Sequence, residues 1–184
     1  MASTTDGGLI LLLGGARSGK SALAVRWGRA HDGPVTFVAT AHAGDDEMAR
    51  RIARHRADRP AGWRTVEEAR DVANAVRTAD PGALVVVDCL TLWLANVSDL
   101  GDAAVLDHAG DLADAAAQRA TPTVVISNEV GLGIVPADPA TRRYRDLLGE
   151  VNATLAARAA RVLLLVAGRV LPLAQPPSLP ADVF

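Results

Sequence analysis

The chain has 184 residues, of which 49% are hydrophobic and 22% are charged, and its formal net charge is −2. This length suits one domain with a sizeable core, and a nearly neutral charge without a basic tract argues against a nucleic-acid or membrane-surface partner. No apolar run is long enough to cross a bilayer, so a membrane span is not expected.

Strand-like apolar runs recur along the chain and predict strands that are buried on both faces. These runs occupy residues 9–13, 35–39, 83–88, 123–127 and 162–167. Helices are expected between them, at residues 20–30, 46–59, 67–78, 103–120 and 139–160. Because strands and helices alternate, the expected fold class is α/β, with a mostly parallel sheet and helices on both of its faces.

The predicted domain covers residues 9–170 and follows a small, polar, flexible tail at residues 1–8, which lacks the basic start of a secretory signal. Four prolines lie in residues 171–184, so we expect an irregular, proline-rich C-terminal extension. Cys89 is the single cysteine, which excludes an internal disulfide and suits a reducing cytoplasm.

The best-supported motif follows the first predicted strand and opens the first predicted helix. It fits the phosphate-binding pattern G-x-x-x-x-G-K-[ST] with Gly14, Gly15, Ala16, Arg17, Ser18, Gly19, Lys20 and Ser21. Lys20 is the single lysine among 19 lysine and arginine residues, and a compact ammonium suits contact with the outer phosphates of a nucleotide. The motif predicts nucleotide binding on a RecA-like P-loop NTPase fold, with Lys20 catalytic.

Asp88 ends the third apolar run, and a carboxylate in that position is typical of the Walker B motif. Together with the hydroxyl of Ser21 it is predicted to hold Mg²⁺. The alternative is that Asp88 caps the helix expected at residues 90–97.

His55 lies on the predicted helix of residues 46–59, which is rich in arginine. Neighbouring cations favour a neutral imidazole that could attack phosphorus, and the alternative is a partly buried helical histidine on an arginine-rich solvated face. The glycine-rich segment 127–136, which includes Glu129, is either a loop that senses phosphate or metal or an ordinary strand-to-helix connection.

Several ordered segments resemble the bifunctional adenosylcobinamide kinase / adenosylcobinamide-phosphate guanylyltransferase family of cobalamin biosynthesis. They are the P-loop at 14–21, Val38-Ala-Thr40, the Asp-Asp-Glu-Met block through Pro60, Trp63-Arg-Thr65 with Glu67, and the Asn-Glu-Val-Gly block at 128–136. The resemblance covers most of residues 9–168, and the two named blocks are specific to the family, whereas the P-loop is not.

The resemblance implies two reactions, with GTP and ATP as nucleotide substrates and a corrinoid as acceptor. A nucleoside triphosphate phosphorylates adenosylcobinamide, and GTP then donates GMP to the resulting phosphate through a guanylylated histidine, which corresponds to His55. The resemblance also implies that the protein assembles as a homotrimer. It further implies a GTP site that is lined by additional residues. These are Ala39, Thr40, Ala41, Arg56, Ala57, Asp58, Arg59, Glu67 and Asp88. Some family members carry glutamate where this chain has Asp88.

Two other classes remain open from the residues alone. One is a P-loop small-molecule kinase without a covalent histidine, in which His55 is dispensable. The other is a nucleotide-dependent switch module, in which residues 130–136 move and a protein partner responds.

Overall fold

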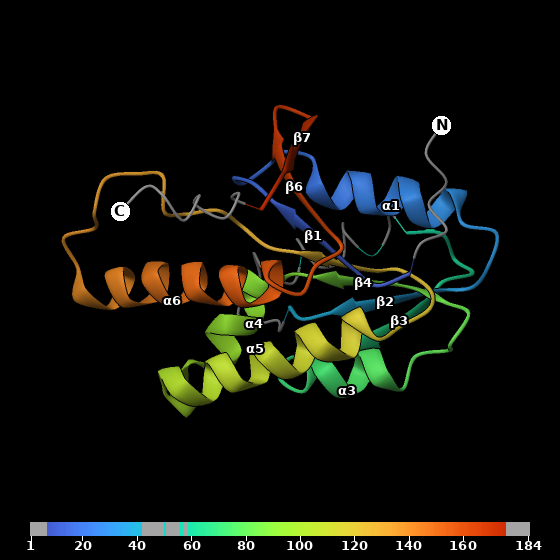
Figure 1. Ribbon diagram of the computed structural model, residues 1–184, viewed down its shortest axis with the longest axis horizontal. Coiled ribbons are helices and arrows are strands. Elements are labelled where there is room, and N and C mark those ends of the chain that lie inside the picture. Colours follow the sequence, from blue (N-terminus) through green and yellow to red (C-terminus); the bar gives the residue numbers. More distant parts are fainter. Residues whose placement is uncertain (1–6, 42–49, 51–55, 57–58, 176–184) are drawn as a thin grey trace, which may run out of the picture.

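The computed structural model describes residues 7–41, 50, 56 and 59–175, and a seven-stranded sheet forms its centre (Figure 1). The strands are β1 (Leu9–Leu13), β2 (Val35–Ala39), β3 (Arg64–Glu67), β4 (Leu84–Asp88), β5 (Thr123–Ile126), β6 (Arg161–Val166) and β7 (Arg169–Leu173). Their order across the sheet is β3-β2-β4-β5-β1-β6-β7. Every neighbouring pair is parallel except β6 with β7, so all strands but β7 end at the same edge.

Helices cover both faces of the sheet. They are α1 (Lys20–Ala30), α3 (Val72–Arg77), α4 (Leu90–Val97), α5 (Asp102–Ala117) and α6 (Pro139–Ala156), with a short 3₁₀ turn at Ser98–Leu100. Figure 1 shows α1 on one side of the sheet and α3, α4, α5 and α6 on the other. The predicted α/β class, with a mostly parallel sheet between helices, is confirmed.

Strand β1 shows why the apolar runs have no polar face. Leu9 and Leu11 belong to the apolar cluster that packs against α3, α4, α5 and α6. Ile10 and Leu12 point the other way and pack in a second cluster with Leu23 of α1. A strand that is covered on both faces favours apolar side chains on both of them, and β1 is apolar and buried at each of its five positions.

The five predicted strands lie within one residue of their observed bounds. The helix predicted from Glu67 is wrong over its first residues, because residues 64–67 form β3 and α3 begins only at Val72. β3 is a half-exposed edge strand, in which only Thr65 and Val66 are partly buried, so it lacks an apolar run. The helix predicted over residues 46–59 lies largely outside the described residues.

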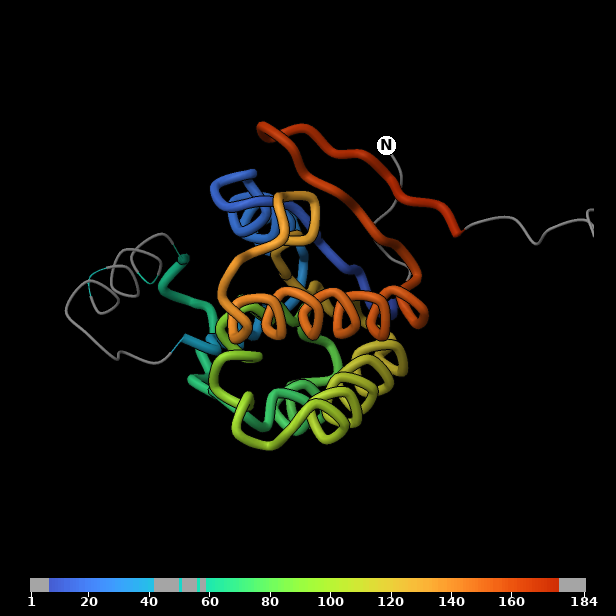
Figure 2. The backbone as a smooth tube through the Cα atoms, turned by 90° about the vertical axis from the view of Figure 1, so that its left-hand side faces the viewer, coloured from blue at the N-terminus to red at the C-terminus, as the bar shows by residue number. Residues whose placement is uncertain are grey.

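The C-terminal end of the described chain also differs from expectation. Irregular structure is predicted from Leu171, but residues 171–173 complete β7, which pairs with β6 in antiparallel fashion. Pro172 is tolerated there because β7 is an edge strand, where a missing N–H leaves no neighbour unpaired. Figure 2 shows this hairpin at the rim of the molecule. Among the described residues, no helix is long and apolar enough to cross a membrane.

Candidate functional site

The loop between β1 and α1 places the predicted P-loop at the carboxyl edge of the sheet. Gly14 has a φ of 145°, and a Cβ there would lie 2.3 Å from the carbonyl oxygen of Leu165. Gly19 has a φ of 104° and directly precedes α1. Both positions therefore require glycine. The tight turn ends at the N-terminus of α1, where free backbone N–H groups and the positive end of the helix dipole bind anions.

The ammonium of Lys20 lies inside this loop. Its Nζ donates hydrogen bonds to the carbonyl oxygens of Gly14 (2.7 Å) and Gly15 (2.8 Å) and to Oγ of Ser18 (3.4 Å). Lys20 is 6% exposed, and this burial lowers its pKa, whereas the nearby Asp88 carboxylate acts in the opposite direction. The cation is thus held by neutral acceptors, which it can exchange for the charged oxygens of a phosphate.

A cavity of about 300 Å³ opens beside Lys20. Its walls come from the P-loop, from the ends of β2, β4 and β5, and from the first turn of α4, so three strands contribute to one site. The lining residues are Ala16, Arg17, Ser18, Gly19, Lys20, Ser21, Ala22, Ala39, Ala41, Arg59, Asp88, Cys89, Leu92, Ile126 and Asn128. Sequence reasoning predicted many of them as nucleotide-binding, and the fold brings these together from distant segments.

Ser21 and Asp88 both line this cavity, and a hydroxyl with a carboxylate is an oxygen donor set that suits Mg²⁺. Within the described part of the chain, no group of three or more His, Cys, Asp or Glu residues is placed to hold a metal. Two protein oxygens fit an ion that takes its remaining ligands from substrate phosphates and water. Helix α4 has Cys89 as its N-cap residue, so Asp88 is not the cap that the alternative interpretation required.

Arg59 brings a second, half-buried cation to the cavity wall. Its guanidinium carbon lies 3.6 Å from the centre of the Phe37 ring, which fixes the side chain through a cation–π contact. Burial lowers the pKa of Arg59, and the carboxylate of Asp88 is the main influence that raises it. The site therefore combines two desolvated cations with one carboxylate, which is the charge pattern expected for a bound metal–polyphosphate.

Other predicted residues lie away from the cavity wall. Arg56 forms an ion pair with Glu67 at 3.5 Å, and their side chains are 68% and 67% exposed. Neither of them lines the cavity. The remaining predicted positions in this segment, His55, Ala57 and Asp58, lie outside the described residues.

Thr40 is fully buried behind the cavity, between Ala39 and Ala41, which line it. Its Oγ1 donates to the carbonyl oxygen of Cys89 (2.8 Å) and accepts from the Cys89 N–H (2.8 Å). Its own N–H donates to the carbonyl oxygen of Asp88 at 3.2 Å. The side chain thus fastens the end of β2 to the end of β4, although the resemblance suggested direct contact with GTP.

Asn128 also lines the cavity, although the sequence placed it only within the candidate segment 127–136 and not among the individual site residues. It follows β5, and its carbonyl oxygen accepts a hydrogen bond from Nδ2 of Asn152 on α6 (3.0 Å). A polar residue directly after a buried parallel strand is the signal that could have identified it. The backbone N–H of Glu129 donates to Gly14 (3.2 Å), and its Oε1 accepts from the N–H of Gly131 (2.5 Å), so this carboxylate closes its own turn.

Solved structures with a similar fold include a recombinase and secretion-system ATPases. The crystal structure of the RadB recombinase gives a TM-score of 0.54 at 21% identity, covering 89% of this chain and 82% of that one. The ATPase of a bacterial type III secretion system gives 0.52 at 16% identity, covering 88% and 52%. These likenesses concern the fold alone and agree with the predicted RecA-like P-loop architecture.

Proteins related in sequence identify the family, whereas the solved structures show only the fold. The family model described as cobinamide kinase / cobinamide phosphate guanyltransferase matches residues 10–173. The bifunctional adenosylcobalamin biosynthesis protein CobP of Pseudomonas aeruginosa is 46% identical over 165 residues, covering 89% of this chain and 95% of that protein. The CobU protein of Salmonella typhimurium is 40% identical over 177 residues, covering 87% and 96%. The chain therefore belongs to the family of bifunctional cobinamide kinases and cobinamide phosphate guanylyltransferases of adenosylcobalamin biosynthesis.

Proposed function

We propose that both reactions of the family use one nucleotide site, the cavity beside the P-loop. In the first, a nucleoside triphosphate phosphorylates the hydroxyl of adenosylcobinamide. In the second, GTP transfers GMP to that phosphate, giving adenosylcobinamide-GDP and pyrophosphate. The observation that carries the proposal is that buried Lys20 lines the same cavity as Asp88 and Arg59.

In the kinase reaction, the acceptor oxygen forms a bond to the γ-phosphorus and the nucleoside diphosphate leaves. The P-loop N–H groups and the N-terminus of α1 bind the phosphates, and Lys20 stabilises the negative charge that develops on their oxygens. Arg59 supplies a further cation at the cavity wall. Ser21 and Asp88 would hold Mg²⁺, which when bound neutralises part of the phosphate charge.

In the guanylyl transfer, we assign the nucleophile to His55. An imidazole nitrogen forms a bond to the α-phosphorus of GTP, and the bond to pyrophosphate breaks. The acceptor phosphate then displaces the histidine from the resulting phosphoramidate, which restores the free imidazole. Residue 55 lies outside the described part of the chain. The support for this assignment is therefore family membership and the Ile-x-x-His-Arg pattern at residues 52–56.

A competition experiment tests the single site. A GTP analogue with methylene groups at both bridging positions cannot be cleaved at either phosphorus. If one cavity serves both reactions, it should inhibit the kinase and the guanylyltransferase competitively with GTP and with equal inhibition constants. Each reaction is assayed separately, with adenosylcobinamide or its phosphate as the acceptor. Constants that differ by more than about tenfold (1.4 kcal/mol) would contradict a shared site.

We also propose that the protein works as a homo-oligomer, a trimer by family resemblance. Large apolar side chains in the connection between β5 and α6 support this, because Leu132 is 86%, Ile134 96% and Val135 60% exposed in the single chain. Contiguous exposed apolar side chains commonly mark protein interfaces. Light scattering of the purified protein is expected to give three times the chain mass, and a monomer at micromolar concentration would contradict the proposal.

A further inference from the structure

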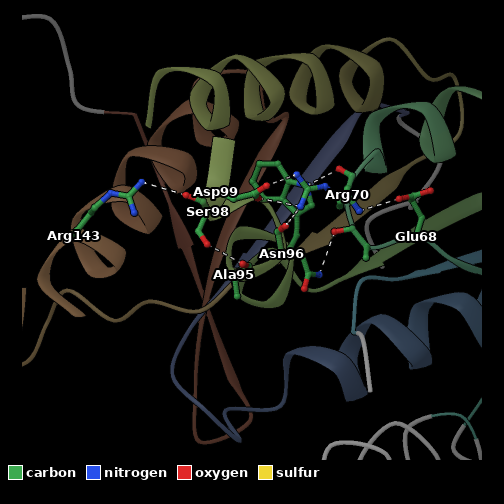
Figure 3. A network of polar contacts seen from close by, with 9 residues as sticks. Glu68, Arg70, Ala95, Asn96, Ser98, Asp99 and Arg143 are labelled. Atoms are coloured by element: carbon green, nitrogen blue, oxygen red, sulfur yellow. Dashed lines mark hydrogen bonds and ion pairs between the residues drawn. The ribbon is translucent and has the colours of Figure 1, made fainter. Parts of the chain in front are cut away.

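Asn96 on α4 links the two strand ends that lie behind the nucleotide cavity. Its Nδ2 donates one hydrogen bond to the carbonyl oxygen of Thr40 (2.8 Å), just after β2. The same nitrogen donates a second to the carbonyl oxygen of Ala69 (3.2 Å), just after β3. Figure 3 shows this amide within a network of polar contacts that includes Arg70 and Asp99.

Thr40, which accepts the hydrogen bond from Asn96, is itself bonded to the backbone of Asp88, the candidate metal ligand, and of Cys89. Thr40 binds the N–H and the carbonyl oxygen of Cys89 through its hydroxyl, and the carbonyl oxygen of Asp88 through its N–H. Cys89 is in turn the N-cap of α4, the helix that carries Asn96. The contacts therefore form a closed ring, in which a shift of Thr40 would also shift the backbone that carries the Asp88 carboxylate.

We propose that Asn96 is a positioning residue for both reactions: by fixing Thr40 it sets the orientation in which Asp88 meets the metal–nucleotide. This rests on the proposed role of Asp88 at the shared site. Ligand carboxylates bind metals well only when the groups behind them hold their orientation, and loss of such a supporting group weakens metal affinity or activity. Asn96 itself does not line the cavity.

The Arg70 side of the same network offers a matched control. Arg70 makes two parallel hydrogen bonds to the carboxylate of Asp99 (3.0 and 3.1 Å), and these bonds lower the pKa of Asp99. Arg70 also donates to the carbonyl oxygen of Asn96. Removing this ion pair takes away a contact between the loop after β3 and the end of α4, but it removes no hydrogen bond of the Asn96 amide or of Thr40. A purely structural role of the network would make both changes equivalent.

The test measures Mn²⁺ binding by electron paramagnetic resonance, with the doubly methylene-bridged GTP analogue present. Asn96→Leu keeps the branched shape of the side chain but removes both N–H donors, and we expect about tenfold weaker Mn²⁺ binding. The Mg²⁺ concentration for half-maximal rate should rise by a similar factor in both reactions. Asp99→Asn should keep Mn²⁺ affinity within about twofold of the wild type. Thermal melting reports whether each variant is folded, and Asn96→Ala replaces Asn96→Leu if the latter does not fold.

The outcomes separate this inference from the proposed function. If Asp88→Asn weakens Mn²⁺ binding but folded Asn96→Leu and Asn96→Ala do not, Asn96 has no positioning role and the inference is overturned. Equal weakening in Asp99→Asn and Asn96→Leu would also overturn it, because the effect would then belong to the whole network. If Asp88→Asn binds Mn²⁺ like the wild type, the metal role of Asp88 fails first, and the inference fails with it.

Discussion

Replacing Lys20 with alanine is expected to lower kcat/KM by about 10²–10³-fold in both reactions. Lys20 is buried in the P-loop beside the cavity, and its Nζ is held by the carbonyl oxygens of Gly14 and Gly15. A water molecule that fills the place of the Lys20 ammonium carries no positive charge. The negative charge on the phosphate oxygens grows in both transition states, so its stabilisation is lost in both reactions. Steady-state rates with adenosylcobinamide and, separately, with its phosphate would measure the two losses.

Lys20→Arg is expected to rescue little of this activity. A guanidinium is a wide planar fork and does not place its charge at the single point where the carbonyl oxygens of Gly14 and Gly15 hold the compact ammonium. Arg26→Ala provides the control, because it removes an exposed cation from the same helix, α1, away from the cavity. A Lys20→Ala variant that kept one reaction near the wild-type rate would show that this reaction does not use the P-loop.

The parts of the site that the sequence predicted are those encoded over a few adjacent residues. The P-loop motif names its own strand, turn and helix, and Gly14 and Gly19 adopt the backbone geometry that the motif requires. Asp88 was found in the same way, as the last residue of an apolar run. In a parallel sheet such strand ends meet at one edge, so their coming together in one cavity could also be expected.

The supporting contacts could not be predicted, because they join residues far apart in the chain. Thr40 and Cys89 are separated by 49 positions, and Asn96 and Thr40 by 56. No local pattern marks an asparagine on a helix as a partner of a distant carbonyl oxygen. Strand β3 was missed for a different reason, since an edge strand with two partly buried residues carries little apolar signal. The function could thus be predicted from local motifs, whereas the groups that hold these motifs in place could be identified only in the structure.

Replacing His55 with alanine is expected to abolish covalent labelling of the protein by GTP labelled at the α-phosphate. A histidine phosphoramidate is lost in acid and survives base, so the wild-type label should show that stability after denaturation. Formation of adenosylcobinamide-GDP should fall by about 10³-fold or more, because removal of a nucleophile eliminates the covalent route. The phosphorylated acceptor should then accumulate, since the bond formed in the kinase reaction is to the acceptor oxygen and not to His55.

His108→Ala is the matched control, because His108 lies exposed on α5 and does not line the cavity. This variant should be labelled like the wild type. Label that persists in His55→Ala would mean that another residue is the nucleophile. Absence of label in the wild type, with GTP bound and adenosylcobinamide-GDP still formed, would mean that the acceptor phosphate attacks GTP directly. In that case the arginine-rich segment around residue 55 would serve to bind the nucleotide, and Lys20 and Arg59 would stabilise a single displacement at the α-phosphorus.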